Sequence, residues 1–478
     1  MTTHSSTTAR PPHRRRSHRV RRALVALLAA GVVAVLAACS GGSTARNAGP
    51  GITVWIVEDL PDRVKATQAI VDDFTKASGI PVELVPVAED QFNQLLISSA
   101  AAGDLPDVVG GVPLAQVRSM SANELIDTAA VGRALQALDP STFSDRALSL
   151  TRDGQTPLAV PSETWMQLLF YRADLFAQAG LEPPTSYDTV MAAAKALDKG
   201  DMAGFVGATA PGDAFTEQTF EQVALGNNCQ LVQQDGKVGL DDKACLEAFT
   251  FYGDLIDKYS VPGAQDVDTT RAAYFAGRAA MFICSTFALD EMAGLRNDAK
   301  PNCAQCAKDP TFLAKNTGVV NSISGPSGKG PAAFGEVTSW TITAQSAADP
   351  STKFVEYMFG DGYVPWIGIA PEGKLPVRQG TPEQPKKFAD AWAALPAGVD
   401  SKAPLSKLYK PEVLQALTGS TEQLSRWAFD QGQGNLLGAL QGEQPVATAV
   451  NEVTSGTDPD KAAKDAADTV RAIQESLS

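Results

Sequence analysis

Histidine is nearly absent from this sequence of 478 residues. The chain contains three histidines, and all of them lie within the first 18 positions. A chain that has lost this leader has no histidine for Ser–His–Asp or Cys–His catalysis, and it lacks the most common zinc ligand. Carboxylates, lysine or tyrosine still allow some catalysis. The composition therefore favours a protein that is not an enzyme, and it implies no cofactor.

Long apolar runs are also missing after the leader. The one prominent run, 23–38, has 16 residues, fewer than the ~20 needed to cross a bilayer. It follows a segment with seven arginines and no acid, and it ends in small residues. A basic start, a short apolar run and a small-residue end predict a secretory signal peptide over 1–38. Arg21 and Arg22 lack the usual neighbours of a twin-arginine signal, so the export route stays open.

Positive charge is scarce in the rest of the chain. Beyond residue 38 there are 33 basic and 54 acidic residues, a net charge of −21. Such a surface repels nucleic acid and anionic membranes, which excludes nucleic acid as an expected partner. The length is too great for one core and suits two domains.

The apolar run ends at Leu36-Ala37-Ala38-Cys39, which resembles the lipobox of bacterial lipoproteins. In that motif the cysteine thiol takes a diacylglycerol group and becomes the new N-terminus. Two or more acyl chains hold a protein stably on a membrane. The segment 40–50 is rich in Gly and Ser and is typical of a flexible tether. We expect the body to be lipid-anchored at Cys39 on the outer face of the cytoplasmic membrane.

The body begins with alternating strand and helix patterns. We expect strands at 52–57, 82–87 and 107–109, with helices between them, the first over 61–77. This βαβαβ order predicts an α/β domain with a largely parallel sheet. Pro86 within the second strand indicates an edge position.

A second unit begins near residue 160. Its expected elements begin with a strand at 168–171, a helix at 174–179 ended by Gly180, and a capping box at 185–188. They continue with a loop rich in Gly and Pro at 325–335, a strand at 337–343, a helix at 350–358 and a last helix from residue 461.

An ordered set of motifs resembles the family 1 extracellular solute-binding proteins of ABC importers, the group that includes maltose-binding protein. Each motif alone is weak, and their common order carries the likeness over about 52–470. The opening strand–helix–strand is followed by AGDLPDVV at 102–109, VP at 160–161 with LFYRADLF at 169–176 and AGLEPPT at 179–185, FAGRAAM at 275–281 and LPVR at 375–378.

This resemblance implies two α/β lobes that close on a ligand by hinge motion. It places one lobe at 51–160 plus 325–372 and the other at 161–324 plus 373–478, with chain crossings near 158–163, 318–335 and 370–378. The chain departs from the family pattern where Phe287 replaces a frequent tryptophan, where Arg172 replaces an asparagine, and in an apparent insertion at 295–316.

Candidate ligand residues follow from the chemistry of sugars. Aromatic faces stack on sugar rings, carboxylates and amides bond hydroxyls, and ligands gather at the carboxyl ends of strands. Each candidate has a plain alternative as a core, capping or surface residue, and Trp392 and Trp427 are expected to pack helices. The candidates are Trp55, Glu58, Gln91, Asp107, Glu163, Trp165, Phe215, Phe287, Trp340, Trp366 and Arg378.

Five cysteines remain after Cys39, so at most two disulfides form and one thiol is left. Cys229 and Cys245 could close a small loop. Cys284 could pair with Cys303 or Cys306. The Cys-x-x-Cys spacing of the last two also fits a redox or metal motif, although no second pair and no histidine support a metal site.

The function expected from these features is capture of a sugar or oligosaccharide by a monomeric lipoprotein, which delivers it to ABC permease subunits. The same role with another solute, such as a polyamine or a glycerophosphodiester, is the alternative. More remote are a secreted carboxylate-based glycoside hydrolase, which needs two acids facing each other across the bond, and an interaction protein without a small ligand.

Overall fold

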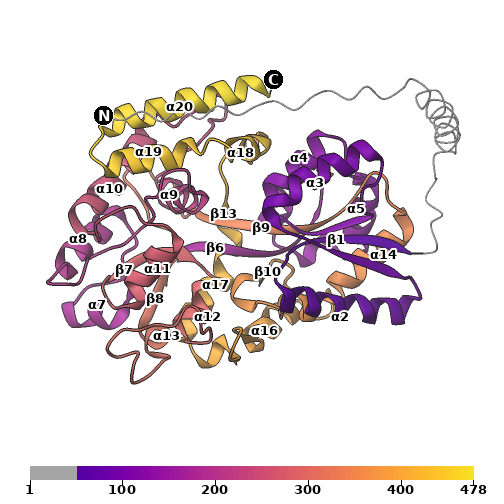
Figure 1. Ribbon diagram of the computed structural model, residues 1–478, viewed down its shortest axis with the longest axis horizontal. Helices are drawn as coiled ribbons and strands as arrows, with labels where there is room; N and C mark the ends of the chain where they lie inside the picture. Colours follow the sequence, from indigo (N-terminus) through magenta and orange to yellow (C-terminus); the bar gives the residue numbers. More distant parts are fainter. Residues whose placement is uncertain (1–50, 478) are drawn as a thin grey trace, which may run out of the picture. The chain divides into compact units, whose positions relative to one another are not determined.

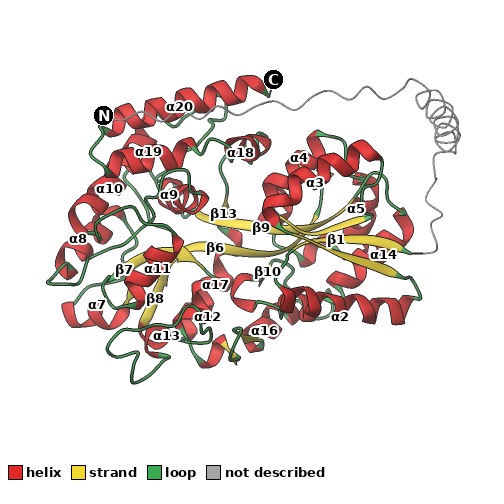
Figure 2. Cartoon of the chain, in the orientation of Figure 1, coloured by secondary structure: helices red, strands yellow, loops and turns green. Residues whose placement is uncertain are grey.

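A computed structural model describes residues 51–477, in which two groups of helices flank one long mixed sheet (Figures 1 and 2). The expected signal peptide, Cys39 and tether lie outside the described residues. Within residues 51–477, no helix combines the length and the apolar character needed to cross a membrane.

The first strands and helices form where the sequence pattern places them. Strands β1 (Ile52–Val57), β2 (Val82–Val87) and β3 (Val108–Val112) are parallel, with β1 in the middle. Proline begins helix α2 (Pro61–Ser78), and Gly79 ends it in the left-handed conformation with φ 72°. Strand β2 lies at the sheet edge, as its proline predicts.

The sheet as a whole is not largely parallel, which corrects the prediction from the βαβαβ pattern. Strands β6 (Val160–Arg172) and β9 (Ala333–Ile342) are antiparallel to each other, and β9 is antiparallel to β3. The order is β10-β6-β9-β3-β1-β2, with β10 (Leu375–Pro376) antiparallel to β6 and β13 (Leu424–Ser425) parallel to β9. Strands that return from the second group of helices therefore join the sheet of the first group.

Strand β6 connects the two groups of helices because it has 13 residues, far more than the four expected. Its first half pairs with β9, and its second half pairs with β7 (Met281–Ser285) and β8 (Thr317–Val320). Figure 1 shows β6 and β9 running side by side between the two groups, so each group is a lobe built on a different part of this sheet.

Helices cover both lobes. The first lobe carries α3 (Glu89–Ala102), α4 (Leu114–Ala122), α5 (Thr128–Ala137), α6 (Asp145–Leu150) and α14 (Ala348–Phe359). The second carries α7 (Ala173–Ala179), α8 (Tyr187–Leu197), α9 (Ala214–Gly226), α10 (Lys243–Tyr259), α11 (Val267–Phe275), α19 (Pro445–Thr454) and α20 (Pro459–Ser476). Short helices α12 (Ala288–Met292), α13 (Phe312–Asn316), α15 (Tyr363–Ile367), α16 (Lys387–Ala394), α17 (Pro411–Gly419) and α18 (Asn435–Leu440) complete the set.

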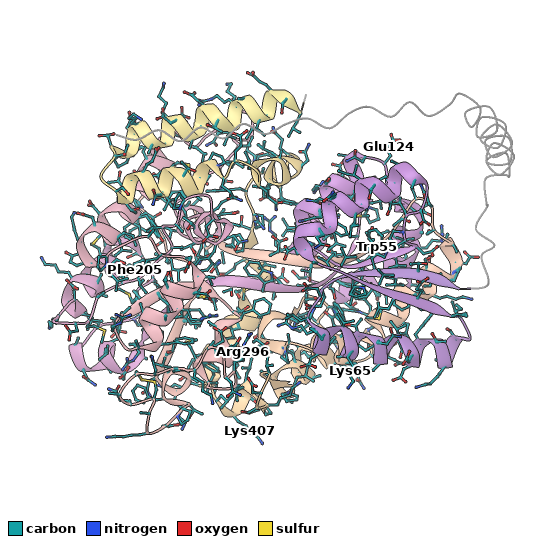
Figure 3. The ribbon with its side chains drawn as sticks, viewed as in Figure 1. Trp55, Lys65, Glu124, Phe205, Arg296 and Lys407 are labelled. Atoms are coloured by element: carbon teal, nitrogen blue, oxygen red, sulfur yellow. A yellow bond between two sulfur atoms is a disulfide. The ribbon has the colours of Figure 1, made fainter. Side chains whose placement is uncertain are left out.

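Local details confirm some expectations and correct others. The capping box before α8 joins Ser186 and Thr189, one residue later than predicted. The Gly- and Pro-rich loop is shorter than predicted, since β9 begins at Ala333. In Figure 3, Phe205 and Trp55 lie among packed side chains, whereas Lys65 and Glu124 are at the surface.

The cysteine pattern resolves into two disulfides and one buried thiol. Cys229 is bonded to Cys245, and Cys303 is bonded to Cys306. Cys284 is free, so its predicted pairing with Cys303 or Cys306 is wrong. It lies in β7 inside the core, where burial raises the pKa of its thiol to about 12. Within residues 51–477, no group of three His, Cys, Asp or Glu side chains is placed to hold a metal ion.

Removing the Cys229–Cys245 bond is expected to lower the free energy of unfolding by about 2–3 kcal/mol, because the bond closes a loop that otherwise gains entropy on unfolding. The two cysteines are 16 positions apart and connect the end of α9 to α10. Urea unfolding of the double alanine variant measures the loss. The matched control replaces Cys303 and Cys306, which are three positions apart and should cost less; an equal or larger loss in the control contradicts the prediction.

Candidate functional site

A cleft of about 400 Å³ lies between the two lobes and has residues of both in its wall. The first lobe contributes the end of β1, the first turns of α2 and the start of α4. The second contributes the start of α9 and the residues after β7, and the connecting strands β6 and β9 form part of the wall. This volume falls in the ~300–1,000 Å³ range of small-molecule sites.

The structure brings six of the eleven candidate residues together around this cleft. They come from five separate stretches of sequence, which supports the expectation that strand ends and chain crossings form one site. They are Glu58, Glu163, Trp165, Phe215, Phe287 and Trp366.

Half-buried aromatic rings form one wall. The centroid of the Trp165 ring lies 6.4 Å from that of Phe287 and 5.5 Å from that of Phe334. Phe287 packs against the backbone of Gly373, where an added Cβ would lie 2.0 Å from the ring. Only glycine allows this approach, so the position of Phe287 depends on that residue. Trp165 and Phe287 are half-buried and offer apolar faces of the size of a sugar ring, whereas Phe334 is fully buried and packs against Trp165.

Arg63 reaches across the cleft from α2 to the ring of Phe287. Its guanidinium carbon lies 5.7 Å from the ring centroid, within the range of a cation–π contact. Its Nη1 also donates to Oε2 of Glu58 at 3.1 Å. Glu58 is thus held at the end of β1 by a partner that contacts both lobes.

Glu163 is buried, and side chains of the protein use both of its oxygens. Nζ of Lys374 donates to Oε1 at 2.6 Å, and Nε1 of Trp366 donates to Oε2 at 2.8 Å. The Lys374 ammonium also lies 3.8 Å from the Trp366 ring centroid. Glu163 therefore positions an ammonium and an indole in the cleft wall.

Sequence reasoning missed a buried charge cluster beside the aromatic wall. Arg426 follows β13 and forms ion pairs with Glu221 of α9 and Glu336 of β9. Oε1 of Glu336 accepts from the N–H of Leu114 at 2.8 Å, and Oε1 of Glu221 accepts from the N–H of Trp427 at 2.7 Å. The cluster holds the start of α4 and the second half of α9 against the connecting strands. The one available signal was an acid at position 336, directly before the predicted strand at 337–343.

Glu217 lies in the first turn of α9 and lines the cleft. Asp213 caps this helix by accepting from the N–H of Phe215 at 3.1 Å, which directs the first turn toward the cleft. Burial and the neighbouring Glu221 carboxylate raise the pKa of Glu217 to about 7, although Arg426 acts in the opposite direction. The carboxyl group therefore exchanges its proton near neutral pH.

Two buried amides in the cleft wall have unused hydrogen-bonding atoms. Oε1 of Gln116 has no partner among residues 51–477, and neither has Oε1 or Nε2 of Gln167. Gln116 is 5% exposed and Gln167 is fully buried. An unsatisfied buried polar atom costs about 1–3 kcal/mol, so these amides are suited to a polar ligand.

The family model for bacterial extracellular solute-binding proteins matches residues 58–365 of the chain. The chain belongs to this family. It is 30% identical over 326 residues to YcjN of Escherichia coli strain K12, whose name assigns it to ABC transporter periplasmic-binding proteins; the match covers 66% of this chain and 71% of YcjN.

Solved structures share the fold of this solute-binding protein. The GacH receptor of Streptomyces glaucescens, solved unliganded and with acarbose, has a TM-score of 0.63 at 22% identity, covering 89% of this chain and 98% of that one. A sugar transporter protein of Arthrobacter chlorophenolicus with bound laminaribiose has a TM-score of 0.65 at 17% identity, covering 88% and 99%. Maltose-bound MalE3 of T. maritima has a TM-score of 0.64 at 18% identity, covering 88% and 99%. The fold is thus the two-lobed form of maltose-binding protein, as the motifs predict.

Two tryptophans predicted to contact ligand lie in the core of this solute-binding protein instead. Trp55 is buried in the middle strand of the first lobe, and Trp340 is completely buried. The Trp340 ring packs against Gly110, where an added Cβ would lie 2.4 Å from it, and its centroid is 5.1 Å from that of Trp366.

The remaining three candidates also lie away from the cleft. Asp107 joins the sheet to α14, because its carboxylate accepts from the N–H groups of Thr53 at 2.8 Å and Ala347 at 2.7 Å. Arg378 is buried and donates to the carbonyl of Leu138 at 2.8 Å. Gln91 is exposed in the first turn of α3 and is not part of the cleft wall.

Proposed function

We propose that this ABC transporter solute-binding protein captures a sugar or oligosaccharide in the interlobe cleft and delivers it to the permease. The observation that carries the proposal is the pairing of the aromatic wall with the unsatisfied amides of Gln116 and Gln167. Apolar ring faces stack on aromatics, and hydroxyl groups use both donors and acceptors. The structural relatives bound to acarbose, laminaribiose and maltose support a carbohydrate.

The mechanism follows from contacts that involve both lobes. A ligand that touches the Trp165 wall and the Glu58–Arg63 side together favours the closed arrangement, because it interacts with both surfaces only there. We place the lobes at 51–160 plus 325–372 and 161–324 plus 373–478. We also propose that a lipidated Cys39 keeps the protein, as a monomer, beside its permease on the outer face of the membrane.

Replacing Trp165 with alanine is expected to weaken binding of the sugar about 100-fold, or about 2.7 kcal/mol, because a central aromatic contact carries a large share of binding energy. The ligand is first identified by thermal unfolding of the full-length protein with mono- and disaccharides, polyols, polyamines and glycerophosphodiesters, since bound ligand raises the midpoint. Titration calorimetry then compares the variant with the wild type.

The matched control is Phe251→Ala, which removes a large aromatic side chain of α10 that is buried outside the cleft wall. It should lower stability and leave the affinity of the folded protein unchanged. A midpoint shift with polyamines or phosphodiesters alone contradicts the carbohydrate proposal and keeps the transport role. Turnover of a chromogenic glycoside contradicts a purely binding role.

A further inference from the structure

Negative charge exceeds positive charge at the end of the cleft formed by α9, α4 and β9. Three carboxylates, Glu217, Glu221 and Glu336, lie around the single guanidinium of Arg426. Arg426 pairs with two of them, and the side chain of Glu217 forms no hydrogen bond or ion pair within residues 51–477. With all groups ionised the cluster has an excess of two negative charges. Such an excess is costly in a desolvated site unless a cation balances it.

Two acceptors at this end of the cleft are unsatisfied, beside the hydroxyl of Thr338, which can donate or accept. Oε2 of Glu221 is buried without a hydrogen-bond partner among the described residues, and so is Oε1 of Gln116. Gln116 lines the same cleft as Glu217, Glu336 and Arg426, and the first turn of its helix α4 is tied to this cluster because the N–H of Leu114 donates to Glu336. Glu217 adds the oxygens of its carboxyl group. A ligand group that fits this corner must supply hydrogen-bond donors.

We propose that the ligand is an aminated carbohydrate whose protonated amine binds between Glu217 and Gln116. This inference rests on the proposed carbohydrate function and narrows it to sugars with a free amino group. An ammonium group brings a positive charge and three N–H donors. A hydroxyl brings one donor and no charge, and an N-acetylated amine keeps one donor and loses the charge. The aromatic wall then holds the apolar face of the sugar ring.

The electrostatics of Glu217 agree with this assignment. Its pKa of about 7 is raised by burial and by Glu221, so at neutral pH the carboxyl group is partly protonated in the absence of a cation. A ligand ammonium within hydrogen-bonding distance favours the ionised form and lowers that pKa. Charge-assisted hydrogen bonds of this kind are about twice as strong as neutral ones.

Matched sugar pairs test the proposal. Calorimetric titration of the full-length protein at pH 7 compares glucosamine, glucose and N-acetylglucosamine, and then the chitosan disaccharide, cellobiose and diacetylchitobiose. We expect each free amine to bind at least ten-fold more tightly than its hydroxyl and N-acetyl counterparts. In Glu217→Gln the preference should fall to about two-fold or less, because glutamine keeps a polar group and loses the charge. The control Glu422→Gln removes the same charge from an exposed position and should keep the preference.

The outcomes separate this inference from the proposed function. Equal or tighter binding of the neutral sugars by the wild type overturns the ammonium assignment and leaves the carbohydrate proposal standing. A preference that survives in Glu217→Gln overturns Glu217 as its cause. Spermidine is titrated alongside the sugars as a polyamine. If spermidine binds and no sugar does, or if no compound in the set binds, both proposals are overturned. The titrations of the wild-type protein with the matched sugars decide the ammonium assignment by themselves. The test is therefore valid even if the variant folds poorly.

Discussion

Replacing Arg426 with alanine is expected to lower the free energy of unfolding by about 3–5 kcal/mol, since removal of one partner from a buried ion pair leaves uncompensated charge. The cost is high because two buried carboxylates, Glu221 and Glu336, lose the same partner. The guanidinium carbon also lies 4.5 Å from the centroid of Phe334, so the change leaves a gap beside the aromatic wall. Urea unfolding followed by tryptophan fluorescence measures the loss.

A second arginine with two acidic partners provides the control. Arg471 of α20 pairs with Asp241 and Asp468, but it is 38% exposed. Exposed pairs contribute about 0–1 kcal/mol, so Arg471→Ala should be nearly neutral. A triple variant, Arg426→Met with Glu221→Gln and Glu336→Gln, should recover most of the stability, because the glutamine oxygens still accept from the backbone. A small effect of Arg426→Ala, or no recovery in the triple variant, contradicts this account.

The sequence was sufficient where local chemistry decides the structure. The run from β1 to β2 has alternating apolar residues, a proline at the start of α2 and a glycine after its end, and each of these acts within a few residues. The family motifs then indicated the two-lobed fold, which the solved structures share.

Strand β9 shows why contact residues were harder to predict. Glu336, Thr338 and Trp340 alternate along one strand, so they share a face. The first two line the cleft, whereas Trp340 is covered by Trp366 and Phe354 from helices that are close to it only in the folded chain. A sequence pattern gives the face of a strand, but the point along the strand where a covering helix begins depends on packing between distant segments.

The charge cluster was missed for the same reason. Glu221, Glu336 and Arg426 lie in three segments, separated by about 90 residues or more from one to the next. No spacing rule connects them. Cys284 likewise gave no local sign that β7 would bury it away from the Cys303–Cys306 loop. Interactions that form only after both lobes fold leave little trace in the sequence.

A second acidic cluster, formed by Asp290, Glu291 and Glu372 near Phe287, makes the stability of the folded state depend on pH. Asp290 of α12 is buried, and neither carboxyl oxygen has a hydrogen-bond partner among residues 51–477. Burial, Glu372 and Glu291 raise the pKa of Asp290 from 3.8 to about 8, although Arg296 opposes this shift. Burial also raises the pKa of Glu372, and it raises that of Glu291 to about 7 despite the ion pair with Arg271. All three carboxyl groups hold protons more tightly in the folded state than in the unfolded chain.

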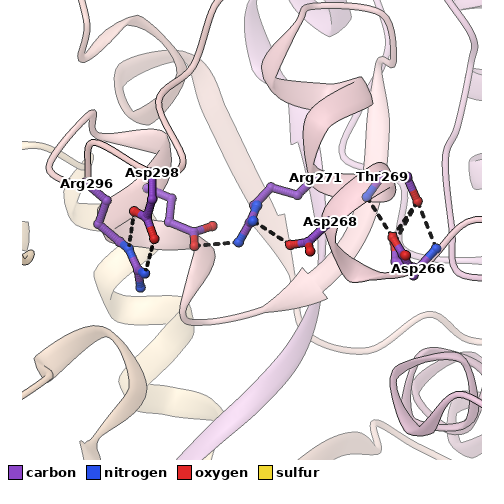
Figure 4. A network of polar contacts seen from close by, with 7 residues as sticks. Asp266, Asp268, Thr269, Arg271, Arg296 and Asp298 are labelled. Carbon is purple, nitrogen blue, oxygen red and sulfur yellow. Dashed lines mark hydrogen bonds and ion pairs between the residues drawn. The ribbon is translucent and has the colours of Figure 1, made fainter. Parts of the chain in front are cut away.

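The arginines beside this cluster have other acidic partners. Arg296 donates to Asp298 at 2.7 Å, and Arg271 donates to Asp268 at 2.6 Å (Figure 4). Their charge is thus shared with exposed carboxylates, which limits how far they stabilise an ionised Asp290. The stability that the Asp290 proton contributes is fully present below about pH 4 and is lost as the pH rises through about 8.

Asp290→Asn is therefore expected to match the wild type in stability below about pH 4, and its advantage over the wild type should grow by roughly 4 kcal/mol between pH 5 and pH 9. Asparagine resembles the protonated acid and cannot ionise, so the variant avoids the charge that the wild type must bury at high pH. Between pH 5 and pH 9 the urea midpoint of the wild type should fall as the pH rises. In the variant this dependence on pH should be smaller by the contribution of about one proton. The control Asp465→Asn changes an exposed carboxylate of α20 whose pKa is lowered by the hydrogen bond to Lys461, far from this cluster in the chain, so this slope should remain. Equal slopes in wild type and Asp290→Asn would show that Asp290 is already ionised in the folded protein.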